Sequence, residues 1–134
     1  MFRSMNVAMM FRVTGIALFI QLALGGLVTF GYIDASIHIV WGIVLGILAI
    51  VTLVYVVRMQ SKTKQLVGLT VGIGVDILIQ AFLGFATLST GSNALAWVHF
   101  LNALAIFAMT LSGMSMAMIA GHMVSTGPMP ATRA

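Results

Sequence analysis

The chain alternates between long apolar runs and short polar connections. The apolar runs lie at residues 13–30, 37–57, 66–88 and 94–120, and the connections lie at 31–36, 58–65 and 89–93. A helix of about 20 residues crosses the roughly 30 Å of hydrocarbon in a bilayer. The pattern therefore predicts an all-α integral membrane protein, a four-helix up-down-up-down bundle. It forms a single transmembrane domain over 1–134, with 121–134 as a short tail.

Composition points to the same class of protein. Hydrophobic residues make up 61% of the chain and charged residues 6%, whereas about 25% of a soluble domain is charged. So few polar groups cannot cover the surface of a small fold in water. Cysteine is absent, which excludes disulfides and thiolate metal sites. The basic residues form no patch beside aromatic side chains, so we expect lipid and not nucleic acid as the surrounding partner.

The basic residues also predict the topology. They all fall on one side of the predicted bundle, before the first run, between the second and third, or after the fourth: Arg3, Arg12, Arg58, Lys62, Lys64 and Arg133. Loops rich in Lys and Arg stay in the cytoplasm. We therefore predict a multi-pass protein of the cell membrane with both termini in the cytoplasm.

An internal repeat divides the chain into two hairpins. The first copy is carried by Gln21, Leu24, Gly25, Gly31 and His38. The second is carried by Gln80, Leu83, Gly84, Gly91 and His99. The residue numbers differ by 59 for the glutamines, 60 for the turn glycines and 61 for the histidines. A repeat of this kind predicts two copies of one supersecondary unit, here two helical hairpins of equal orientation.

The repeated histidines are the candidate metal ligands. Equal orientation places His38 and His99 at similar depth, on helices that face each other diagonally across a four-helix bundle. A histidine within a membrane span is a functional hypothesis by default. We predict that His38 and His99 bind the iron of one haem b per chain, and that Gly42 and Ala103, one turn further on, leave room for the macrocycle. The alternative is two interfacial histidines satisfied by water or backbone carbonyls.

Other polar residues have structural interpretations. We expect Asp76 to be protonated and hydrogen-bonded to Thr110 or Ser112, as a clamp between helices or, alternatively, a proton relay. Gln21 and Gln80, at equal depth, are expected to pair across the bundle.

Two further features complete the sequence predictions. Small-xxx-small motifs at Gly42/Gly46 and Gly68/Gly72 predict close helix packing. His122, 23 residues beyond His99, lies about 35 Å away along a helix and belongs to the cytoplasmic end.

The quoted repeat resembles one half of the haem A synthase family. The segment Gln21–Thr29, the glycine turn, His38, and their echo from Gln80 to His99 carry the resemblance, which covers nearly the whole chain. That family consists of two four-helix halves, and compact archaeal forms have a single half. The resemblance implies haem held by His38 and His99. The family pattern has a catalytic glutamate three residues before the first histidine and an arginine directly after it, where this chain has Ala35 and Ile39.

Three functions follow from these features. The first is a b-type cytochrome, an electron-transfer or accessory subunit of a respiratory, terminal oxidase-type complex. The second is a compact haem A synthase that converts haem O to haem A, with Asp34 as the catalytic carboxylate; the other interpretation of Asp34 is an N-cap of the second helix. The third is a haem-free structural subunit of a membrane complex.

Overall fold

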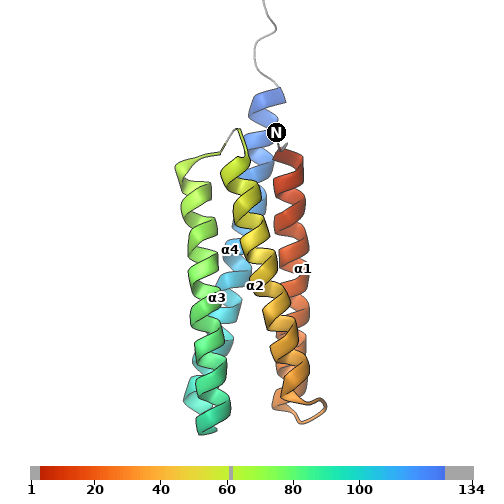
Figure 1. Ribbon diagram of the computed structural model, residues 1–134, viewed down its shortest axis with the longest axis vertical. Coiled ribbons are helices and arrows are strands. Elements are labelled where there is room, and N and C mark those ends of the chain that lie inside the picture. The colour runs from red at the N-terminus through yellow and green to blue at the C-terminus, as the bar shows by residue number, and fades with distance from the viewer. Residues whose placement is uncertain (1–3, 61, 126–134) are drawn as a thin grey trace, which may run out of the picture.

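The described part of the computed structural model consists of four helices (Figure 1). The structure describes residues 4–60 and 62–125, and their side chains from 6 to 120. The helices are α1 (Ser4–Thr29), α2 (Ala35–Arg58), α3 (Lys64–Thr90) and α4 (Asn93–Ser125). Each is long and apolar enough to cross a membrane, and a helix satisfies its backbone groups internally, as lipid requires. The predicted integral membrane bundle is confirmed.

The first and last helices, α1 and α4, extend beyond the predicted apolar runs. Helix α1 begins at Ser4 because Val7 and Phe11 are buried against the other helices, which stabilises the additional turns. Arg12 therefore lies within α1, where its side chain is exposed. Helix α4 continues to Ser125, so the first residues of the predicted tail are helical. The remainder of the tail, residues 126–134, lies outside the described residues.

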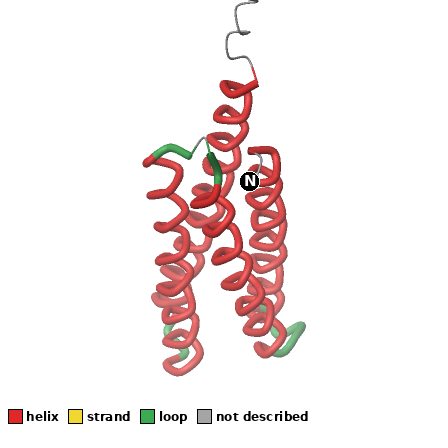
Figure 2. Tube along the Cα trace, turned by 45° about the horizontal axis from the view of Figure 1, so that its top comes forward, coloured by secondary structure: helices red, strands yellow, loops and turns green. Residues whose placement is uncertain are grey.

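Consecutive helices run antiparallel and pack around one axis (Figures 1 and 2). Helix α1 packs against α2 and α4, and α3 packs against the same two helices. The diagonal pairs are therefore α1 with α3 and α2 with α4. The α1–α2 and α3–α4 pairs are the two hairpins predicted from the repeat.

The turns within the two hairpins use equivalent glycines. Gly31 follows α1 with φ of 74°, and Gly91 caps the C-terminus of α3 with φ of 63°. Glycine adopts this left-handed conformation without the steric cost of a Cβ. The predicted correspondence of Gly31 and Gly91 is therefore seen in their backbone conformation.

The buried core occupies one half of the bundle, the half that carries Arg58, Lys62 and Lys64. We call this half the basic end and the opposite half the histidine end. In α1 no described residue beyond Leu18 is fully buried, and in α2 none before Leu45. The same holds in α3 beyond Ile73 and in α4 before Ala103. Figure 1 shows the two hairpins diverging toward the histidine end, so the helices pack more closely at the basic end.

Close helix contacts occur at glycines other than those of the small-xxx-small motifs. A Cβ at Gly113 would overlap the ring of Phe11, which joins α4 to α1. A Cβ at Gly46, Gly68 or Gly72 would meet nothing within 4 Å. The prediction of close packing is therefore wrong for these three residues, because an almost uniformly apolar helix does not reveal from sequence which face turns inward.

Candidate functional site

The imidazoles of His38 and His99 face each other across the histidine end. His38 lies in the first turn of α2 and His99 near the start of α4. Their ring centroids are 6.1 Å apart, with an angle of 68° between the ring planes. Both residues are partly buried. The predicted meeting of the two rings across the diagonal is confirmed.

Each histidine is held by the glutamine of its own hairpin. Gln21 Nε2 lies 3.1 Å from His38 Nε2 and donates to the His38 carbonyl oxygen at 3.1 Å. In the second hairpin, Gln80 Nε2 lies 3.3 Å from His99 Nε2 and donates to the His99 carbonyl oxygen at 2.9 Å. The predicted pairing of Gln21 with Gln80 is wrong, because each amide is engaged by the adjacent helix rather than by the diagonal one.

These contacts fix where the ring protons lie. An amide nitrogen only donates hydrogen bonds, so each histidine Nε2 accepts and the proton of the neutral ring is on Nδ1. His38 Nδ1 and His99 Nδ1 are both buried, and neither has a hydrogen-bond partner. A buried polar atom without a partner is costly. Each ring N–H therefore lacks an acceptor in this arrangement.

Glycines on the neighbouring helices make room for the rings. A Cβ at Gly25 would lie 3.1 Å from His38 Cε1, and a Cβ at Gly84 would lie 3.0 Å from His99 Cε1. Both glycines belong to the sequence repeat, but their role beside the rings was not predicted. The signal was present: each lies four residues after its glutamine, on the same helix face.

Gly42 and Ala103 occupy different surroundings from those of Gly25 and Gly84. A Cβ at Gly42 would lie 3.3 Å from Gln21 Nε2, so Gly42 makes room for the amide that holds His38. Ala103 is the first fully buried residue of α4 and stands where the closed core begins. Their predicted contact with a macrocycle stays a prediction.

The repeat is broken at one pair of residues beside the glutamines. Trp41 and Asn102 are equivalent, each three residues after its histidine. Trp41 Nε1 donates to the Ala17 carbonyl oxygen at 2.8 Å. Asn102 Nδ2 donates to the corresponding carbonyl, that of Asp76, at 3.3 Å, and also to Gln80 Oε1 at 2.9 Å. Indole has a single N–H, so Gln21 Oε1 is left buried without a partner.

Asp34 caps the N-terminus of α2, as one interpretation of the sequence predicted. Its carboxylate accepts from the Ser36 backbone N–H at 2.8 Å. Hydrogen bonding to the Ser36 side chain and backbone lowers the pKa of Asp34 from its ordinary value. The side chain is therefore a charged, exposed cap four residues before His38.

Asp76 does not form the predicted clamp. The Thr110 hydroxyl donates to the Ile106 carbonyl oxygen and the Ser112 hydroxyl to the Ala108 carbonyl oxygen, both one turn back in α4. Ser112 is exposed on the outer face of that helix. Hydroxyls within a helix commonly bond to their own backbone in this way, and neither hydroxyl is hydrogen-bonded to the Asp76 side chain.

The facing rings suit a metal that brings most of its own ligands. Among the residues that the structure describes, no group of three or more His, Cys, Asp or Glu side chains could hold a metal ion. Two imidazoles on opposite sides of one centre are instead the axial ligand set of a haem, whose macrocycle supplies the other four nitrogens. Because Nδ1 carries the ring proton, a metal would have to bind at Nε2 and take the place of the glutamine contacts.

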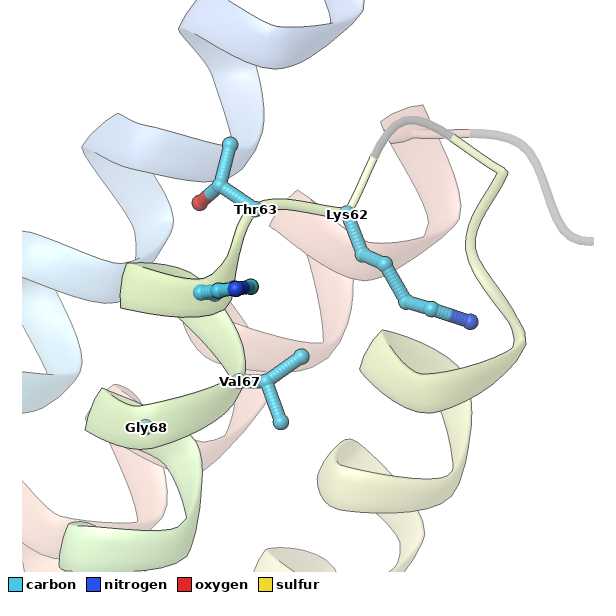
Figure 3. A pocket seen from close by; sticks show the side chains of 5 residues that line it. Lys62, Thr63, Val67 and Gly68 are labelled. Carbon is cyan, nitrogen blue, oxygen red and sulfur yellow. The ribbon is translucent and has the colours of Figure 1, made fainter.

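A concavity lies at the basic end, far from the histidines. It has a volume of about 400 Å³ and is lined by Lys62, Thr63, Lys64, Val67 and Gly68. Figure 3 shows Lys62 and Val67 directed toward the side of α2, while Thr63 turns away. Thr63 caps α3 by accepting from Leu66 N–H. This concavity contains none of the predicted site residues.

Comparisons of the chain with protein-family models, with curated proteins and with solved structures find no match. The resemblance to haem A synthase therefore stays a prediction from sequence. What the structure adds is geometry: it brings His38, His99 and their glutamines together, and it leaves Asp76 outside the hydrogen bonds expected of it.

Proposed function

We propose that this membrane protein binds one haem b between its two hairpins, with His38 and His99 as axial ligands. The observation that carries the proposal is the 6.1 Å separation of the ring centroids. Two metal–imidazole bonds of about 2 Å each, on opposite sides of one metal, place the ring centres about 6 Å apart. The observed centroid separation is close to this value.

The surrounding residues support the same assignment. No described residue at the histidine end is fully buried between the hairpins. Gly25 and Gly84 keep the neighbouring helices close to the rings without contacting them through a side chain. A flat, largely apolar group bound between α2 and α4 would add packing at the histidine end.

Electron transfer is the activity that this ligand set favours. Haem supplies one-electron redox chemistry when bound, and two protein ligands leave no open position for a substrate. The family's catalytic glutamate corresponds to Ala35, which has no acid–base group. Asp34 is engaged as the cap of α2. We therefore favour a b-type cytochrome over a synthase.

The proposal also includes the orientation of the protein in the membrane and the subunits that it contacts. The positive-inside rule places the basic end in the cytoplasm, so the haem lies near the opposite surface of the cell membrane. The connections are short, and large apolar side chains such as Phe82 and Phe85, each 71% exposed, point outward. Other subunits of a respiratory complex would therefore bind through the lipid-facing sides of the helices.

Absorption spectra of the protein purified from membranes test the proposal. We expect a low-spin haem b spectrum and a pyridine haemochrome that gives one haem b per chain. His38→Ala and His99→Ala should each abolish the low-spin spectrum, because one axial ligand is lost. His122→Ala is the matched control and should leave it intact.

Two outcomes would contradict this function. A spectrum unchanged in both ligand variants would remove the assignment of His38 and His99. Conversion of haem O to haem A by the wild-type chain, lost in Asp34→Asn, would replace the cytochrome with the synthase.

A further inference from the structure

The basic end of the bundle has positive charge but no acidic side chain. The chain contains only two acidic residues, Asp34 and Asp76. Asp34 caps α2 at the histidine end. Asp76 lies 12 residues beyond Lys64 in α3, which is about 18 Å along the helix. Neither carboxylate therefore reaches the lysines of the connection between α2 and α3.

The two lysines of this connection lie in opposite local fields. Lys62 Nζ donates to the Val57 carbonyl oxygen near the C-terminus of α2, where the partial negative charge of a helix end favours a cation. Lys64 is instead the first residue of α3, where the partial positive charge of a helix N-terminus disfavours a cation. The first turn of α3 contains no acidic residue. An anion beside Lys64 would relieve this repulsion.

The concavity at the basic end joins these lysines to an apolar surface. Besides Lys62, Thr63 and Lys64, its lining includes Val67 and Gly68. Figure 3 shows Val67 and Gly68 one turn into α3, next to the connection that carries Lys62.

The apolar part of this surface faces away from the bundle core. Gly68 is exposed, and a Cβ there would meet nothing within 4 Å. Val71, one turn beyond Val67, is 45% exposed. The surface therefore changes from cationic to apolar along the start of a membrane-spanning helix, which matches a molecule with an anionic head and an apolar tail.

We propose that this concavity binds one anionic phospholipid, with its phosphate held by Lys62 and Lys64 and its acyl chains over Val67 and Gly68. An ammonium group has three N–H donors, so Lys62 can bind phosphate while it keeps its bond to Val57. Basic pockets between membrane-spanning helices bind anionic lipid headgroups in this way. A free phosphate ion would use the lysines but would gain nothing from the apolar part of the surface.

Lipid titration of the protein purified in detergent tests the site, with bound lipid counted by native mass spectrometry. Phosphatidylglycerol and phosphatidylcholine with identical acyl chains are the two probes. We expect one phosphatidylglycerol to be retained at concentrations at which phosphatidylcholine is not. Lys64→Gln should weaken phosphatidylglycerol binding by about 5-fold, the usual contribution of one basic residue at an anionic membrane surface. Arg12→Gln is the matched control, because it removes one exposed positive charge from α1.

A second pair of variants tests the apolar part of the site at constant charge. Gly68→Leu places a large side chain in the concavity and should weaken phosphatidylglycerol binding. Gly74→Leu is the control: it makes the same substitution in the same helix, outside the lining of the concavity, where a Cβ meets nothing within 4 Å. It should leave lipid binding unchanged.

Three results would overturn the lipid site. Equal binding of the two lipids would remove the role of the lysines. Equal losses in Lys64→Gln and Arg12→Gln would show attraction by the overall positive charge and not by this concavity. Inorganic phosphate that displaces phosphatidylglycerol at equal concentration would identify a site for free anions. All three measurements are independent of haem content, so they leave the proposed function untouched.

Discussion

Gly25 and Gly84 show how single residues position the imidazoles. Each lies on the helix next to its histidine, and a Cβ would come within 3.0–3.1 Å of the ring. Contacts this short force the ring to move, since protein interiors are closely packed. The absence of a side chain therefore determines how near each histidine lies to the neighbouring helix.

Replacing Gly25 with leucine should displace the imidazole ring of His38. We expect Gly25→Leu to lower haem affinity by about 10-fold or more, equivalent to about 1.4 kcal/mol, because overpacking of this size typically costs about 1–3 kcal/mol. The measurement is haem content per chain by pyridine haemochrome. Gly26→Leu is the control, since a Cβ there meets nothing within 4 Å; equal loss in both variants would contradict the role of Gly25.

The sequence predicts the histidines but not the hydrogen bonds around them. The repeat is visible because Gln, Gly and His recur at nearly constant spacing, and constant spacing implies equal depth. The roles of Trp41 and Asn102 were not predicted, because the repeat places different residue types at that position. Which amide atom meets which ring depends on side-chain rotation, which no spacing encodes.

At the scale of the helices, the four membrane spans predicted from hydropathy are observed. The close helix contacts predicted for Gly46, Gly68 and Gly72 are not. Hydropathy locates all four helices because a membrane span must be apolar along its length. The same uniformity hides the inward face, so Gly68 and Gly72 were assigned to helix contacts that they do not make. The contact between α1 and α4 depends instead on Gly113 and Phe11.

Replacing Gly113 should loosen the packing of α1 on α4. The ring of Phe11 is 1% exposed and occupies the space that a methyl group would need. We expect Gly113→Ala to lower the free energy of unfolding by about 1–3 kcal/mol. Gly74→Ala, where a Cβ meets nothing within 4 Å, should not be destabilising. Thermal unfolding in detergent compares the two, and an undiminished stability of Gly113→Ala would contradict this packing.

At the scale of the whole molecule, packing is uneven along the bundle axis. Fully buried side chains gather at the basic end, and the hairpins diverge at the histidine end. The core at the basic end joins both hairpins and includes Phe11, Leu66 and Ile106, all at most 1% exposed. We therefore expect this end to contribute most of the stability of the bundle.

The absence of cysteine makes the orientation directly measurable. Single cysteines at Tyr32 and Gln65, both exposed and at opposite ends of the bundle, have no background labelling. With the basic end in the cytoplasm, a membrane-impermeant maleimide should label Tyr32→Cys in intact cells and Gln65→Cys only in inverted vesicles. The reverse pattern would place the basic end outside.

The matching Gln–His units of the two hairpins also have an evolutionary consequence. Each hairpin holds its own histidine through bonds that stay within that hairpin. Two identical hairpins, associating about a twofold axis, could therefore have built the same pair of rings before they were joined in one chain. Gene duplication and fusion would produce this arrangement. The divergence of Trp41 from Asn102 requires the duplication, because a homodimer must carry the same residue on both sides.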